Sequence, residues 1–420
     1  MNDAEKIIPM PRREPDGAHD VAGRAGECLA NNEVESPPPE FGTLDGTELL
    51  DSLQTWFGRF VIAHEDDLSL LAVWTVHTYL CTELHTTPRL QLDSIAPECG
   101  KTTVLEHLER LCRDALLAVD LTSAALIPRM LQRKLRTLLL DEVQRTLNDR
   151  RPECAGVMAV INSGYRDGAK RPVLVPRGRE WVEQEMSTFA PVCMAGISPH
   201  LANDTLSRSL RILLMPDHEG EAEDSDWEEL GGVVDELAAR VALWSDSVRS
   251  HVKEKSTGEL PEGCRGRLRE KWRPLMRVAE LADGTGGSAS RWTSKVYELA
   301  AADLANQQAE REAGLTPQTP GLVLLQDLAA IWPDHQYFVP TQDLIDLLLK
   351  HNPQYWGPNV DSGNFYKALN AHRLGRMIKQ ATNTTSRRPG GGGTPHGYEV
   401  AQLEPAWKRY GVVRAECPTD

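Results

Sequence analysis

Two kinds of hydrophobic pattern occupy the first half of the chain. Apolar residues recur at helical spacing in 49–60 and 66–84, which predicts two helices that bury one face or more. Short apolar runs follow at 90–95, 135–140 and 192–197. Runs of this length, separated by helical patterns, are typical of buried parallel strands. The pattern therefore predicts an α/β protein.

The second half is helical until its last stretch. The acidic stretch 219–229 is predicted to begin a helix, because acids there complement the helix dipole. Helical periodicity returns at 233–249, 268–281 and 292–312, and a linker rich in glycine and proline follows at 314–321. This helical stretch occupies the position of the lid of AAA+ ATPases.

The last region is predicted to hold three helices and a β-hairpin. Helices are expected at 322–332, at 341–349 with Thr341 as N-cap, and at 365–379. A glycine-rich stretch and a strand-like run at 397–400 follow. Helices followed by a hairpin suggest a winged-helix-like fold.

These patterns divide the chain into five parts. The order is a disordered tail at 1–45, a helical segment at 46–85, an α/β core at 86–216, a helical lid at 217–315 and a winged-helix-like domain at 322–414. The tail is predicted to be disordered because it is rich in proline and charge and lacks apolar periodicity.

A Gly-Lys-Thr sequence stands between the first core strand and the next helix. In the context strand, loop and helix, this sequence indicates a P-loop, whose backbone N–H groups hold phosphate. The candidate nucleotide-binding residues are Pro97, Glu98, Cys99, Gly100, Lys101, Thr102 and Thr103. Lys101 is expected to reach the β- and γ-phosphates, and Thr102 to ligate Mg²⁺. The match is incomplete, since the full motif requires glycine where Ile95 stands. The alternative is an ordinary strand-to-helix turn capped by Thr102.

Two adjacent carboxylates follow the apolar run 135–140. Asp141 is suited to holding Mg²⁺, and Glu142 to orienting or deprotonating an attacking water. The carboxyl ends of parallel strands meet at one sheet edge, so both acids are expected near Lys101. The alternative is a strand that ends in solvated acids.

Three further residues are candidates in an ATPase site. Ser198 ends the run 192–197 and could sense the γ-phosphate, or be a plain strand-end serine. Arg208, or Arg211 as second choice, could act as a finger on the nucleotide of a neighbouring subunit, which would require a homo-oligomer. A surface salt bridge is the alternative for Arg208.

Basic residues gather in two places. Arg373, Arg376 and Lys379 are spaced to share a helix face, and Arg387 and Arg388 fall near the expected wing tip. Their surroundings are basic in an acidic chain, which favours contact with DNA phosphates. Docking on an acidic partner is the alternative. Within the core, the basic segment 164–179 could form a hairpin that lines a channel, or a solvated loop.

Together these residues resemble one family. Motif blocks at 139–142, 161–166, 187–191, 195–197 and 204–209 are similar to those of the domain-of-unknown-function family 3631 (DUF3631). The likeness continues through blocks at 341–344, 369–374, 396–398 and 406–407. The family is a bacterial P-loop ATPase-like group found beside primase or helicase modules. The resemblance therefore implies nucleotide binding in a replication or mobile-element context, with primase or other replication proteins as partners.

Composition narrows the class of protein. The formal net charge of the 420 residues is -15, which excludes a general polyanion binder but not a local basic surface. Eight scattered cysteines form no C-x-x-C pair and are read as reduced thiols. No signal peptide and no apolar run of about 20 residues is present, which predicts a cytoplasmic protein without membrane contact.

Three functions are consistent with the sequence. The leading hypothesis is a Mg²⁺-dependent, helicase-like ATPase that acts on DNA. The second is a DNA-binding adaptor that is switched by bound ATP and hydrolyses little. The third is a structural assembly factor whose site is inactive.

Overall fold

The computed structural model describes most of the chain. The described residues are 45–118, 124–146, 152–197, 201–253, 258–284, 290–313, 319–357, 369–389 and 394–414. The predicted disordered tail lies outside these ranges except for Asp45, as does most of the predicted linker.

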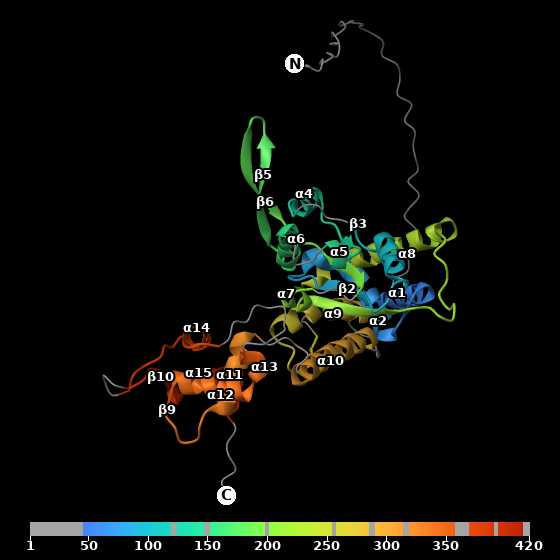
Figure 1. The fold of residues 1–420 in the computed structure, drawn as a ribbon. Coiled ribbons are helices and arrows are strands. Elements are labelled where there is room, and N and C mark those ends of the chain that lie inside the picture. The colour runs from blue at the N-terminus through green and yellow to red at the C-terminus, as the bar shows by residue number, and fades with distance from the viewer. Residues whose placement is uncertain are drawn as a thin grey trace, which may run out of the picture. The chain divides into compact units, whose positions relative to one another are not determined.

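A six-stranded, mostly parallel sheet forms the centre of the α/β region (Figure 1). Its strands run in the order β1-β8-β2-β7-β4-β3, and only β1 is antiparallel to its neighbour. The bounds are β1 Ile62–Ala63, β2 Arg89–Ser94, β3 Leu116–Ala118, β4 Leu138–Leu140, β7 Val192–Ile197 and β8 Ser209–Met215. The three predicted strands are confirmed as β2, β4 and β7, and β7 separates the other two.

Both faces of the sheet are covered at its centre, where β2, β4 and β7 are buried along almost their whole length. Leu138 and Leu140 pack in one buried cluster with residues of α4 (Leu126–Arg133) and α6 (Pro152–Ser163). Leu139 alternates with them and is also fully buried. The helix α3 (Lys101–Leu111) packs against β2, β3, β4 and β7. Short helices α5 (Val143–Thr146) and α7 (Asn203–Leu206) follow β4 and β7.

The predicted N-terminal and lid-like helices are present. The first pair is α1 (Gly46–Phe60) and α2 (Glu65–Leu80), and the 3-10 turn η1 (Cys81–Glu83) ends the second. The later set is α8 (Trp227–Val248), the 3-10 turn η2 (Arg249–Val252), α9 (Gly266–Asp283) and α10 (Arg291–Glu312). Within the described ranges, no helix is both long enough and apolar enough to traverse a lipid bilayer.

The prediction that 219–229 begins a helix is wrong for most of that stretch. The helix α8 begins at Trp227, where Asp226 caps it by accepting from Glu228 N. Upstream, the carboxylate of Asp217 accepts backbone N–H groups of Gly220, Glu221 and Ala222 at 2.8–3.1 Å. This local side-chain cap competes with helix formation and makes a loop. We call residues 217–225 the acidic loop.

The basic core segment folds as a β-hairpin (Figure 1). Strands β5 (Lys170–Arg177) and β6 (Glu180–Ser187) pair along their whole length and turn at Gly178. The apolar side chains of Leu174 and Trp181 are 58% and 65% exposed. The hairpin therefore presents both basic and apolar side chains to solvent.

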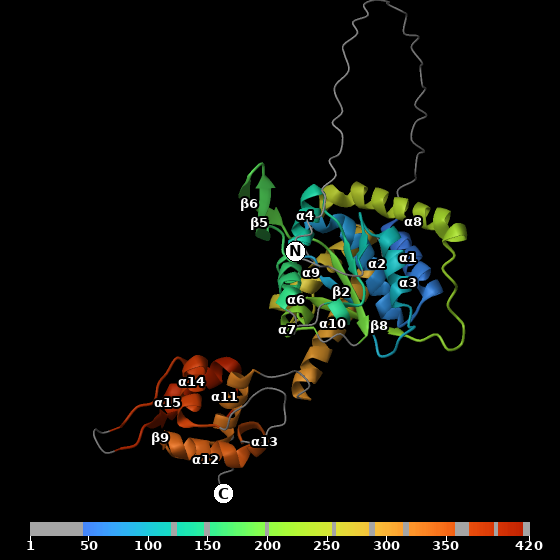
Figure 2. The same ribbon diagram turned by 45° about the horizontal axis from the view of Figure 1, so that its top comes forward.

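The C-terminal region has its own hydrophobic cluster. Figure 2 shows the helices and strands of this region gathered together. Its elements are α11 (Pro320–Ile331), β9 (Phe338–Pro340), α12 (Thr341–His351), α13 (Pro353–Trp356), α14 (Ala371–Thr382), β10 (Gly397–Glu399) and α15 (Val400–Tyr410). Strands β9 and β10 are antiparallel, and Arg387 pairs with Gly397 as a bridge.

Two boundaries in this region differ from the prediction. Thr341 is the first residue of α12 instead of its N-cap, because its hydroxyl donates to His396 O at 2.9 Å and so ties the helix start to the β10 side. The third helix begins at Ala371 and not at 365, because Asn370 caps it by accepting from Arg373 N. Positions 365–368 lie outside the described residues.

Candidate nucleotide site

The loop between β2 and α3 has the strained backbone that a close phosphate cradle requires. Gly100, which directly precedes the helix, has φ 77° and ψ 15°, and Glu98 has φ 59°. A Cβ at Gly100 would come within 3.0 Å of the Val61 side chain, so both conformation and space favour glycine. Ile95 stands where the full motif has glycine, and it is 81% exposed.

Lys101 begins α3 and turns back to its own loop. Its Nζ donates to Ser94 Oγ at 2.5 Å and to Ala96 O at 3.4 Å. Ser94 is the last residue of β2 and is buried. The Lys101 ammonium is thus hydrogen-bonded to the loop between β2 and α3, whose backbone would face a bound phosphate.

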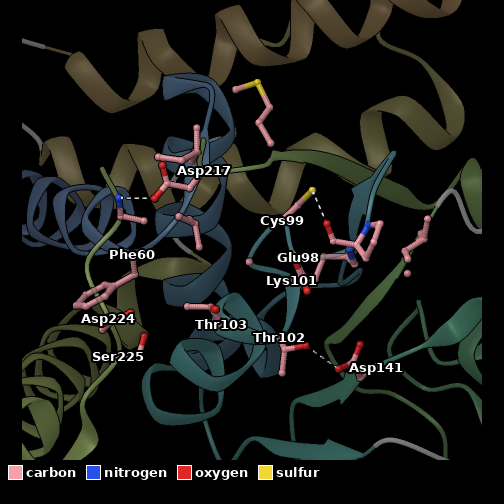
Figure 3. Close-up of a pocket in the computed structure, with 18 of the residues that line it drawn as sticks. Phe60, Glu98, Cys99, Lys101, Thr102, Thr103, Asp141, Asp217, Asp224 and Ser225 are labelled. Carbon is pink, nitrogen blue, oxygen red and sulfur yellow. Dashed lines mark hydrogen bonds between the residues drawn. The ribbon is translucent and has the colours of Figure 1, made fainter. Parts of the chain in front are cut away.

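Thr102 and Asp141 meet as predicted from the two strand ends. The Thr102 hydroxyl donates to Asp141 Oδ2 at 3.2 Å, and Figure 3 shows the two side chains pointing toward each other. The other oxygen of Asp141 accepts the backbone N–H of Glu142 at 2.7 Å. Glu142 has φ 50°, which turns the chain sharply after β4. A hydroxyl and a carboxylate oxygen are ligands that fit Mg²⁺.

A cavity of about 540 Å³ joins these residues, which is the size range of sites for small organic ligands. Its lining includes Phe60, Val61, Ile62, all of 97–103, Asp141, Glu142, Gln144, Gly196, Ile197, Met215, Asp217 and 222–225. In Figure 3, Phe60, Asp224 and Ser225 lie on one side of the cavity, and Thr102 and Asp141 on another.

His107 of α3 fastens the acidic loop beside this cavity. Its Nδ1 accepts from Trp56 Nε1 at 3.0 Å, since an indole N–H is only a donor. The other ring nitrogen therefore carries the proton and donates to Ser225 Oγ at 2.9 Å. The imidazole is also packed between the rings of Phe60 and Trp227, at 4.4 and 4.6 Å. Burial lowers the pKa of His107 to about 4, so the ring is neutral at pH 7.

A second fastening joins the acidic loop to the end of α1. Arg59 donates to both carboxylate oxygens of Glu223, at 2.9 and 2.6 Å. The backbone N–H of Glu223 donates to Arg59 O at 2.7 Å. The bonds through Arg59 and His107 hold the acidic loop as one wall of the cavity.

The cavity is strongly acidic. Its charged lining residues are Lys101 and the six acids Glu98, Asp141, Glu142, Asp217, Glu223 and Asp224. Glu223 is compensated by an ion pair with Arg59 at 2.6 Å. An isolated polyphosphate would meet net repulsion here, whereas a polyphosphate bearing Mg²⁺ carries less charge.

The finger candidates lie elsewhere. Arg208 directly precedes β8, which is parallel to β2, so it stands at the sheet edge opposite the phosphate loop. Its guanidinium bonds to Asp204 and is 10% exposed. Arg211 pairs with Asp93 at 2.8 Å. Ser198 lies outside the described residues, although Gly196 and Ile197 before it line the cavity.

The basic residues predicted to bind nucleic acid lie in the C-terminal region. Arg376 and Lys379 are exposed on α14, and Arg373 on the same helix is half-buried. Arg387 and Arg388 are exposed beside the bridge to Gly397. Four of these five side chains are therefore exposed, and their contact with DNA stays a prediction.

The wall made by Phe60, Val61 and the acidic loop was missed by the sequence analysis. These residues come from the end of α1 and from the segment after β8. No motif marks them, and the run of acids resembled the start of a helix. The antiparallel pairing of β1 with β8 and the bonds between Arg59 and Glu223 bring the two segments together.

Comparison with known proteins supports part of the family resemblance. The model of the family "Protein of unknown function (DUF3631)" matches residues 220–410. The match includes the lid-like helices and most of the C-terminal region. The phosphate loop, Asp141 and the motif blocks at 139–209 precede it. No curated protein matches the chain.

Some solved structures share distant likeness with the chain. The apo C-terminal region of NrS-1 aligns with 12% identity and a TM-score of 0.38, covering 84% of this chain and 74% of that one. A full-length MCM homologue from Methanopyrus kandleri aligns with 13% identity and a TM-score of 0.36, covering 62% and 60%.

Proposed function

We propose that this protein binds and hydrolyses ATP with Mg²⁺ and acts on DNA in a replication-associated, helicase-like role. The observation that carries the ATPase part is the Thr102–Asp141 hydrogen bond at the mouth of a glycine-bearing phosphate loop. It brings together a hydroxyl and a carboxylate, which are ligand types that Mg²⁺ takes, and this contact supports the proposal. The order β2-β7-β4 then puts both candidate motifs at one sheet edge, as in a P-loop ATPase with a helical lid.

Each residue has a distinct task in this proposal. The backbone N–H groups of 98–102 and the start of α3 hold the phosphates. Lys101 leaves Ser94 and Ala96 to reach the β- and γ-phosphates, and Thr102 with Asp141 holds the metal. Bound Mg²⁺ would neutralise phosphate charge. Glu142 orients the water that attacks the γ-phosphate.

The acidic lining of the cavity predicts that nucleotide binding requires a metal ion. Nucleotide binding should depend strictly on Mg²⁺, because the cavity offers six carboxylates and one lysine. Within the described residues, no three His, Cys, Asp or Glu side chains form a metal-holding group. Mg²⁺ commonly binds through one or two protein ligands and substrate phosphates, so it is expected to arrive with the nucleotide.

Turnover and binding measured together test the ATPase. Lys101→Ala should abolish binding of Mg²⁺–ATP in calorimetry. Glu142→Gln should keep binding and lower turnover at least 100-fold. Lys350→Ala, which removes a charge from the exposed face of α12, is the control and should leave both unchanged. Failure of the wild-type protein to bind Mg²⁺–ATP would refute the proposal and favour the structural assembly factor.

A nucleotide-switched adaptor is the second candidate. The observation that favours it is the position of the Lys101 ammonium, which already bonds to Ser94 and Ala96 in a loop that lacks the first motif glycine. Such a site would bind ATP and turn it over slowly. Tight binding with no measurable turnover, with or without DNA, would decide for the adaptor.

The proposed DNA contact is the exposed basic surface of α14 and of the segment at Arg387 and Arg388, where Arg387 bridges to Gly397 of β10; we read this region as a winged helix. Helix, strand, two helices, a further helix and a returning strand occur in that order. Arg376 and Lys379 lie three positions apart on α14, so both project from one side of the helix. The basic side chains would neutralise phosphates.

Salt-dependent binding tests this contact. Arg376→Gln with Lys379→Gln should weaken duplex binding and lower the slope of log K against log salt by about 1.8. Lys350→Gln in the same region is the control. An unchanged slope in the double variant would exclude α14 as the DNA surface.

A further inference from the structure

A second cavity lies at the sheet edge opposite the phosphate loop. Its volume is about 580 Å³. It is bordered by the residues that lead into β2, by η2 and by the first three turns of α9. The lining residues are 83–86, Val252, Lys253, Gly266, Arg269, Glu270, Arg273, Pro274 and Arg277. Thr86 precedes β2, whereas Gly100 follows it, so the two cavities stand at opposite strand ends.

One face of α9 supplies a row of arginines to this cavity. Arg269, Arg273 and Arg277 are spaced four residues apart, which places successive members about 6 Å apart along the helix axis. Arg269 and Arg273 are exposed, and no described residue pairs with either. Arg277 is 8% exposed and donates to Val252 O at the cavity's inner end.

The acids of the cavity are already engaged. Glu83 pairs with Lys253 at 3.0 Å. Glu270 accepts from Arg166 at 2.6 Å and from Arg267 at 2.9 Å. The lining carries four cationic side chains and two acids, so its formal charge is +2 in a chain of -15. Burial lowers the pKa of Arg277; Glu280, which pairs with Arg277 at 3.5 Å, raises it, and the neighbouring Arg273 lowers it.

The floor of the cavity is rigid. Pro274 lies inside α9 and has no N–H for the carbonyl of Glu270. The hydroxyl of Thr86 donates to this carbonyl at 2.8 Å and so replaces the missing helical bond. The segment before β2 is thereby locked to the helix that bears the arginines, which keeps the row in place before a ligand arrives.

We propose that this cavity, with the arginine row of α9 as its wall, binds a ligand with successive phosphate groups. Arginine forks suit phosphate oxygens, and two exposed guanidinium groups whose residues lie about 6 Å apart along the helix axis can each bind one phosphate. Such phosphates occur in a nucleic-acid strand or in a small polyphosphate. The nucleic-acid source rests on the proposed DNA role, whereas the polyphosphate source does not.

The test uses the full chain carrying Lys101→Ala, which removes phosphate binding at the first site. Tripolyphosphate binding is measured by calorimetry, and binding of a labelled oligothymidylate by anisotropy across a salt series. Adding Arg269→Gln and Arg273→Gln should weaken at least one ligand tenfold or more. For the oligonucleotide, the slope of log K against log salt should fall by about 1.4.

A matched control separates the site from general charge. Arg133→Gln with Arg311→Gln removes the same charge from exposed positions of α4 and α10, and should change neither affinity. If the Arg269→Gln, Arg273→Gln variant loses binding of the oligonucleotide alone, the ligand is a nucleic-acid strand. If it loses binding of tripolyphosphate alone, the ligand is a small polyphosphate. If the α9 variant binds both as the control does, the proposal is overturned. ATP turnover in chains that retain Lys101 is measured separately, so failure of this site leaves the proposed ATPase untouched.

Discussion

Replacing His107 with glutamine tests how the acidic loop is fastened beside the nucleotide cavity. The imidazole is 1% exposed and is neutral when it accepts from Trp56 and donates to Ser225. Protonation would place a second proton against the Trp56 donor and bury a charge. Glutamine does not titrate, and its amide has an oxygen that can accept from Trp56 and an NH₂ group that can donate to Ser225.

The magnitude follows from the pKa of His107. Burial lowers it from 6.5 to about 4. Because the pKa of His107 is lower in the folded than in the unfolded protein, the neutral ring contributes its full stabilisation above pH 6.5, the unfolded-state pKa. This stabilisation is lost as the pH falls from 6.5 toward 4. A difference of about 2.5 pKa units corresponds to about 3 kcal/mol.

Urea unfolding between pH 4.5 and 7.5 measures this effect. The wild type should lose about 2 kcal/mol more than His107→Gln over the range, since most of the titration falls within it. Taking the difference between the two proteins cancels groups that titrate in both. His218→Gln, an exposed histidine of the acidic loop, is the control and should follow the wild type. Equal pH slopes for wild type and His107→Gln would refute the reasoning.

Three further predictions concern stability. Gly164→Ala should destabilise the fold by several kcal/mol in urea unfolding, because its Cβ would stand 1.9 Å from Thr188 O; an unchanged midpoint would contradict this contact. Arg89 is fully buried and donates to the carbonyls of Thr87, Ala190 and Ile161. Arg89→Leu should therefore lower the free energy of unfolding by about 3–5 kcal/mol. A variant as stable as the wild type in urea unfolding would show that those carbonyls find other donors. Burial raises the pKa of Asp67 to about 6, so the contribution of this carboxyl to stability is full below pH 3.8 and is lost as pH rises through 6. Asp67→Asn should therefore raise the melting temperature at pH 8 and have little effect at pH 4. A larger rise at pH 4 than at pH 8 would contradict this reasoning.

The local patterns of the chain predicted most elements because burial imposes them directly. Apolar runs predicted β4 and β7, since a strand covered on both faces favours apolar side chains. The run at 90–95 predicted β2, although it includes the buried polar residues Gln91 and Asp93. The candidate phosphate loop was predicted from its Gly-Lys-Thr sequence between a strand and a helix, and Asp141 from its position after an apolar run. Helix starts were less predictable, because a single side-chain bond decides them: Asp217 prevents a helix over the acidic loop, and Asn370 delays the start of α14.

The sequence by itself determined the order of elements, the apolar core positions and the contact expected between Thr102 and Asp141. The tertiary structure decided which distant segments share a cavity. The pairing of β1 with β8 brings Val61 to the acidic loop, and the Thr86–Glu270 bond sets a row of arginines beside the N-terminal end of β2. Neither arrangement has a local signal, because each depends on contacts between residues more than 100 positions apart.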